Sequence, residues 1–101
     1  MQRDEILNRA KECICKERQA EYGDAKVNFS LVGLLWEDYL SLINPNISID
    51  AEDVAIMMAL LKIARIATGS GTADSFVDLA GYAALAGEIS TQHNFMEGKN
   101  E

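Results

Sequence analysis

The segment from Val54 to Ala67 constrains the fold more than any other part of this 101-residue chain. It is predicted to be a helix that is apolar nearly all round, with Lys62 and Arg65 as its charged residues. Such a helix must either lie at the centre of a helical domain or face another subunit. We therefore expect an all-α, four-helix bundle-like domain that is completed by oligomerisation, as a homodimer or a homotetramer.

Two helices are expected before this segment, because apolar residues recur there at helical spacing. The first runs from about Arg3 to Glu21, and the glycine of Tyr22-Gly23-Asp24 is suited to end it. The second carries its apolar stripe from Phe29 to Ile43 and stops at Asn44-Pro45-Asn46, which has the residues of a turn. Its aromatic residues are expected in the core, and one of them could instead stack on a base: Phe29, Trp36 and Tyr39.

Capping residues predict where the third and fourth helices begin. Asp50 is a good N-cap, and Asp53 can complete a capping-box-like arrangement before the apolar helix, which ends at Gly69. Thr72 or Asp74 can cap a fourth helix that continues to about Thr91. Residues 1–93 are thus expected to form a single domain, followed by a frayed tail over 94–101.

Charge and composition exclude several classes of protein. A net charge of -7 without a basic cluster argues against a nucleic-acid polymer as a partner. The apolar run from Val54 to Leu61 is far too short to span a bilayer, so no membrane is expected and the protein should stay in the cytoplasm. Cys13 and Cys15 are expected to be reduced thiols, because their spacing on a helix points them to different faces.

A pair of acids on the fourth helix is the first candidate site. Asp74 and Asp78 are spaced i, i+4, so they project from one side of the helix within reach of a shared cation. Tyr82 continues the same side and is a candidate substrate contact. The alternative is that Asp74 caps the helix and both acids lie in solvent near its positive end.

Acids on the other helices extend this hypothesis. Glu37 lies at the border of an apolar stripe and could reach inward, although a solvated role is the usual one. Asp53 opens the third helix, where capping is its alternative role. Facing carboxylates in a helical bundle are a recurring way to hold divalent metals, and oxygen ligands favour Mg²⁺ or Mn²⁺. The candidate metal ligands are therefore Asp74, Asp78, Asp53 and Glu37.

Cations in the chain have two possible roles. Lys62 and Arg65 lie i, i+3 on an apolar helix, and they need either carboxylates from another helix or subunit, or the phosphate oxygens of a ligand. Arg18 is equally open between a structural ion pair and a phosphate contact. Lys62, Arg65 and Arg18 are thus candidates for substrate binding.

Several motifs together resemble a family of small phage and prophage proteins over roughly Arg18 to Glu88. The most specific is Asp-x-x-x-Asp-Leu-Ala-Gly-Tyr, from Asp74 to Tyr82. It follows, in order, Glu21-Tyr22-Gly23-Asp24, Phe29 with Leu35-Trp36, Asp53-Val54-Ala55 and Leu61-Lys62-Ile63-Ala64-Arg65. Such proteins look like distant relatives of the MazG-type all-α nucleoside triphosphate pyrophosphohydrolases, which carry acidic magnesium ligands and assemble as dimers or tetramers. The chain departs from the Glu-x-x-Glu and Glu-x-x-Asp pairs of those enzymes, since it offers Glu37-Asp38 and an Asp pair one residue wider.

The resemblance implies an activity. The expected reaction is the magnesium-dependent hydrolysis of a (d)NTP to a (d)NMP and pyrophosphate, in a bacterial host cell that carries the phage or prophage. Asp74, Asp78, Asp53 and Glu37 would be the metal ligands, and Glu37, if it is not a ligand, would orient or deprotonate the attacking water. The rival hypothesis is a non-enzymatic helical module that binds a nucleotide or a host protein.

Overall fold

The computed structural model describes residues 1–17, 24–69 and 71–96, except for the side chains of Glu17 and of residues 93–96. Every regular element in these ranges is helical, which confirms the all-α prediction. In chain order the elements are α1 (Arg3–Glu12), a π-helix η1 (Cys13–Glu17), α3 (Ala25–Ser41), α4 (Ala51–Ala67) and α5 (Ala73–Met96). No helix within the described ranges is both long enough and apolar enough to cross a membrane.

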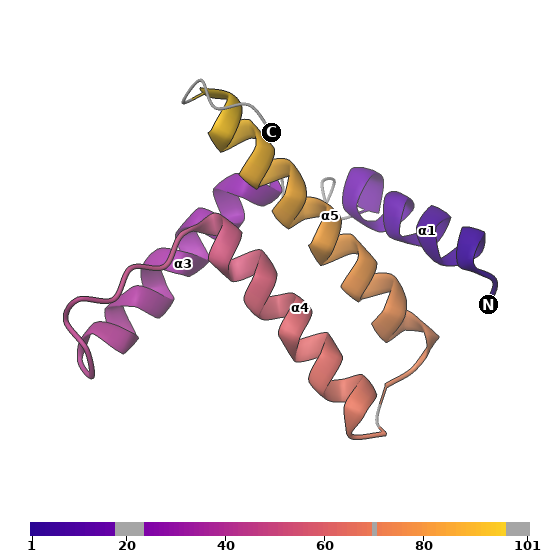
Figure 1. The fold of residues 1–101 in the computed structure, drawn as a ribbon, viewed down its shortest axis with the longest axis horizontal. Coiled ribbons are helices and arrows are strands. Elements are labelled where there is room, and N and C mark those ends of the chain that lie inside the picture. Colours follow the sequence, from indigo (N-terminus) through magenta and orange to yellow (C-terminus); the bar gives the residue numbers. More distant parts are fainter. Residues whose placement is uncertain (18–23, 70, 97–101) are drawn as a thin grey trace.

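The central element is the hairpin of α4 and α5, which run antiparallel side by side (Figure 1). The segment α1 with η1 packs on α5, and α3 packs on α4. Figure 1 shows that α3 crosses near the beginning of α4 and then diverges from it. The predicted central position of the apolar helix is therefore correct, because α4 contacts both α3 and α5.

Aspartates at the helix starts explain where α3 and α4 begin. Oδ1 of Asp24 accepts the backbone N–H of Lys26 at 2.8 Å, so α3 starts at Ala25, directly after this N-cap. At α4, Asp50 and Asp53 form the predicted capping box, with reciprocal N–H to carboxylate bonds of 2.9 and 3.1 Å. These bonds satisfy amides that have no partner within the helix.

The ends of the helices differ in part from the prediction. Gly69 follows α4 with a φ of 83°, as expected for a residue that ends a helix. The fourth helix continues to Met96, beyond the expected end near Thr91. The first helix is α-helical only to Glu12 and then becomes the π-helix η1, in which Ile14 packs against Gly81 of α5. Residues 18–21 of the predicted first helix lie outside the described residues.

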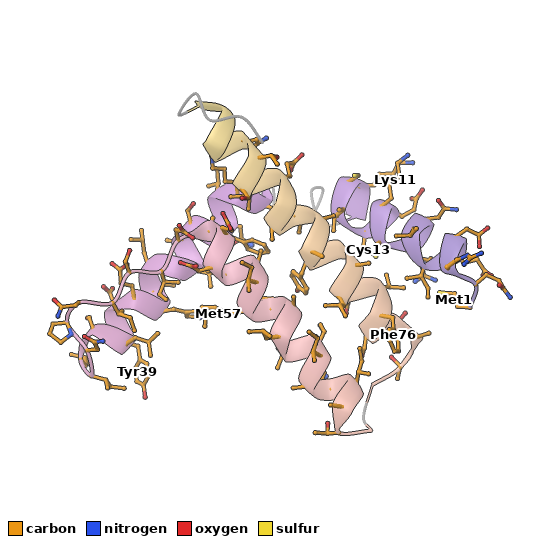
Figure 2. The ribbon with its side chains drawn as sticks, in the orientation of Figure 1. Met1, Lys11, Cys13, Tyr39, Met57 and Phe76 are labelled. Carbon is orange, nitrogen blue, oxygen red and sulfur yellow. The ribbon has the colours of Figure 1, made fainter. Side chains whose placement is uncertain are left out.

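The core lies where α3, α4 and α5 meet. Its buried residues include Phe29, which was predicted there, and Trp36 packs against it while partly exposed. Tyr39 was also expected in the core, and this was wrong: it is 67% exposed in the last turns of α3, where that helix has diverged from α4 (Figure 2). The other buried core residues are Ala51, Val54, Ala55, Leu85 and Ile89.

Candidate functional site

Lys62 and Asp78 form an ion pair between α4 and α5. The Lys62 Nζ lies 3.1 Å from Oδ2 of Asp78, and the side chains are 17% and 40% exposed, respectively. The antiparallel hairpin places these two residues level with each other. One of the two predicted partners of Lys62, a carboxylate from another helix, is therefore confirmed.

Asp74 lies one helical turn before Asp78 and is exposed. Because α5 begins at Ala73, Asp74 is the second residue of the helix and Thr72 is the residue that precedes it. The N–H of Thr72, just before α5, donates to Oγ of the buried Ser75 in the first turn of the helix at 3.3 Å. Asp74 thus sits in the first turn, where its charge is favoured by the helix dipole.

Glu37 reaches toward the segment that leads into α4. Its Oε1 accepts the N–H of Ile49 at 2.9 Å, and its side chain is half-buried. The hydrogen bond links the C-terminal part of α3 to the residue just before the Asp50 cap. One carboxylate oxygen of Glu37, Oε1, therefore has a structural role.

The predicted metal ligands fall into two groups within one chain. Asp78 lies beside Lys62, toward the end of α4, and Asp74 lies one turn before Asp78 on α5. Asp53 lies in the first turn of α4 and accepts the N–H of Asp50, next to the Ile49 amide that binds Glu37. Lys62 follows Asp53 by nine positions, which is about 13.5 Å along the helix axis. Glu37 and Asp53 thus do not meet the acids of α5 in one chain.

A magnesium ion held by three or more side chains does not fit this arrangement. Among the described residues, no group of three His, Cys, Asp or Glu side chains is placed to hold a metal ion. Magnesium is often bound by one or two carboxylates together with the phosphates of its substrate. The Asp74 and Asp78 pair fits that second mode, in which the ion arrives with a ligand that also satisfies Lys62.

The other predicted substrate contacts occupy different environments. Arg65 is exposed in the last turn of α4, one turn after Lys62. Tyr82 is half-buried, with its ring centroid 6.2 Å from that of Phe29 at an interplanar angle of 34°, so it contributes to the core. Arg18 lies outside the described residues.

Two cavities lie beside η1. A small one of about 90 Å³ has Asp78 and Tyr82 in its wall, together with Cys13 and Ile14. A larger one of about 400 Å³ lies between η1, the start of α3 and α5, and its polar lining includes Asp24, Lys26 and Glu88. Sequence reasoning missed the larger cavity, because its wall combines residues from three elements without a shared motif. None of the predicted metal ligands lines it.

Comparison with known proteins identifies relatives among phage proteins. A family model described as a domain of unknown function, DUF6378, matches residues 5–90. The Gene 55 protein of Mycobacterium phage L5 is 42% identical over 80 residues, which cover 79% of this chain and 49% of the relative. The Gene 55 protein of Mycobacterium phage D29 is 38% identical over 86 residues, which cover 85% of this chain and 54% of the relative.

These matches support the predicted membership of an uncharacterised phage family. The chain spans about half the length of both Gene 55 proteins. No solved structure matches the chain. The distant likeness to MazG-type enzymes remains a prediction.

Proposed function

Because the chain belongs to the DUF6378 family of domains of unknown function, with phage proteins among its relatives, we propose that it is a magnesium-dependent nucleoside triphosphate pyrophosphohydrolase. The proposed reaction converts a (d)NTP and water into a (d)NMP and pyrophosphate. The resemblance of the chain's motifs to those of MazG-type enzymes suggests this class of reaction. The contact between Lys62 and Asp78 carries the proposal, because it brings a predicted phosphate contact and a predicted metal ligand together.

The charges at this contact match those of a magnesium–triphosphate complex. Lys62 is mostly buried and needs an anionic partner, which is now the carboxylate of Asp78. A triphosphate oxygen can replace that carboxylate, and Asp78 is then available, with Asp74, to bind the accompanying cation. When bound, the cation supplies positive charge that offsets the charge of the triphosphate. Arg65, one turn after Lys62, would contact a further phosphate oxygen.

A second subunit is needed to bring the remaining acids to this site. Asp53 lies in the first turn of α4, and Glu37, on α3, binds the N–H of Ile49 just before α4, so in our proposal they act on a substrate held by another copy of the chain. The hydrogen bond from Ile49 orients Glu37 through Oε1 and leaves Oε2 to accept a proton from the attacking water.

The direct test measures products from each common NTP and dNTP, with and without Mg²⁺ or Mn²⁺. Detection of both monophosphate and pyrophosphate, by ³¹P NMR, identifies cleavage between the α and β phosphates. We expect metal-dependent turnover that is lost in Asp78→Asn and strongly reduced in Glu37→Gln. The matched control is Asp38→Asn, an exposed acid on α3 outside the proposed site, which should retain activity.

Circular dichroism must first show that the variants are helical, so that a loss of activity can be attributed to the substituted side chain and not to unfolding. Absence of monophosphate and pyrophosphate from all nucleotides with both metals would reject the hydrolase. Equal activity of wild type and Asp78→Asn would reject the site while keeping the reaction.

The second candidate function is a non-enzymatic helical module that binds a nucleotide or a host protein. It is favoured by the observation that Asp78, Asp53 and Glu37 each already have a partner within the chain. This candidate predicts that a nucleotide binds by calorimetry without a divalent ion and without turnover, or that no nucleotide binds. Dependence of both binding and turnover on Mg²⁺ would exclude it.

A further inference from the structure

The outward faces of α3 and α4 carry large apolar side chains. Leu42, which follows the last residue of α3, is 84% exposed, and Leu60 on α4 is 57% exposed. Figure 2 shows Tyr39 and Met57 at the opening where the two helices diverge. We call the following residues the α3–α4 apolar surface: Leu31, Leu35, Leu42, Ile56, Met57 and Leu60.

Charged residues are nearly absent from the segments that form this surface. Residues 27–36 contain none, and residues 54–64 contain only Lys62. Lys62 is turned toward α5, where it binds Asp78. The spacing of Ile56, Leu60 and Ile63 places them along one side of α4, away from its buried residues. On α3 the exposed acid Asp38 lies on the same face, between Leu35 and Leu42. A largely apolar surface of this kind, with one acid on its α3 side, marks an interaction surface.

The size of the exposed surface agrees with a missing subunit. The chain has an accessible area of 7142 Å², whereas a folded monomer of 11.1 kDa exposes roughly 5,650 Å². The excess of roughly 1,500 Å² lies within the range that each subunit of an obligate homodimer buries. The radius of gyration of 14.9 Å also exceeds the value of about 13 Å for a compact domain of this length.

We propose that the α3–α4 apolar surface binds a second copy of the same chain and forms a two-fold symmetric homodimer. A two-fold interface brings the same surface of both copies together, so that surface must be complementary to itself. A largely apolar face meets this condition, although each chain carries a net charge of -7. Most charges of both copies then remain outside the contact, and Asp38 and Asp53 are the acids of α3 and α4 that lie closest to it.

The formation of this interface does not depend on the proposed activity, since a chain without activity would associate through it in the same way. It also has a consequence for the candidate site. Asp53 lies seven residues before Leu60 and therefore on the same side of α4. A partner that covers Leu60 would thus approach Asp53 as well.

The test compares molar masses by light scattering during size-exclusion chromatography. We expect the wild type at twice the chain mass of 11.1 kDa, and both Leu35→Glu and Leu60→Glu at the mass of one chain. The matched control is Leu7→Glu on α1, a leucine that is 63% exposed and lies outside the surface; it should remain dimeric. A monomeric wild type, or a dimer that survives either surface substitution, would overturn the proposal.

A second measurement applies if the glutamate variants fail to fold. In a Cys13→Ser, Cys15→Ser background, we expect the added cysteine of Leu60→Cys to link two copies under mild oxidation, because the centre of α4 faces its symmetry mate. Leu7→Cys in the same background should give no linked dimer. Equal cross-linking of the two variants at dilute protein concentration would contradict the proposed interface.

Discussion

Lys62 and Asp78 differ in their access to solvent although their charged atoms are 3.1 Å apart. The lysine side chain is 17% exposed, and the aspartate side chain is 40% exposed. Loss of the aspartate therefore leaves a mostly buried cation without its partner. Loss of the lysine leaves a carboxylate that water can reach.

This asymmetry predicts unequal effects of the two substitutions on stability. We expect Asp78→Asn to lower the free energy of unfolding by about 1 to 2 kcal/mol, because the Lys62 ammonium stays in its partly buried position. Lys62→Met, which keeps the apolar stem of the side chain, should cost less than about 1 kcal/mol. Urea unfolding monitored by circular dichroism measures both. An equal or larger loss in Lys62→Met would contradict this explanation.

The hydrogen bond between Glu37 and Ile49 predicts a difference between two substitutions at one position. Glu37→Ala removes the acceptor of a half-buried backbone N–H, so we expect a loss of about 1 to 2 kcal/mol. Glu37→Gln retains an oxygen acceptor and should lie close to the wild type in stability. Thermal and urea unfolding should agree on this order; two variants of the same stability would mean that the bond contributes nothing.

The capping box at the start of α4 should be important for stability because it begins the central helix. We expect Asp50→Ala to cost about 0.5 to 2 kcal/mol, since the amide of Asp53 loses its acceptor. Asp38→Ala removes an exposed acid from the interior of α3 and should be neutral or slightly stabilising. If both alanine variants unfolded at the same urea concentration, the capping box would not contribute to the stability of the protein.

Two glycines within helices should respond in opposite directions to the same substitution. A Cβ atom at Gly33 would lie 2.8 Å from the backbone oxygen of Ile49, so Gly33→Ala should destabilise the protein by about 1 to 3 kcal/mol. A Cβ atom at Gly87 would have no neighbour within 4 Å, so Gly87→Ala should stabilise α5 by about 0.5 to 1 kcal/mol. Differential scanning calorimetry of both variants checks the predicted change of sign.

The fold was largely predictable because its signals are local. Asp50, Asp53 and Gly69 fix the ends of α4 through bonds and backbone angles that depend on a few adjacent residues. The π-helix at Cys13 was not predictable in this way, because Ile14 packs against Gly81, which is far away in the sequence. Tyr39 was misplaced because helical spacing identifies an apolar stripe but gives no indication of where α3 separates from α4.

The candidate site was less predictable than the fold. Helical spacing placed Asp74 and Asp78 on one side of a helix, and burial of Lys62 required a partner from another element, which proved to be Asp78. Spacing within single helices could not show that Asp53 begins α4 at the opposite end of the hairpin. That separation depends on the direction in which α4 and α5 pair, which is a property of the tertiary structure.

The order of elements along the chain has a consequence for how the protein folds. Only residues 68–72 separate α4 from α5, whereas about sixty residues separate the end of α1 from the start of α5, on which α1 packs. Closing the longer loop costs more chain entropy, so the α4–α5 hairpin should form early and α1 should dock late. We expect the amide hydrogens of α1 to exchange with solvent sooner than those of the hairpin, since the last segment to dock is the first to open.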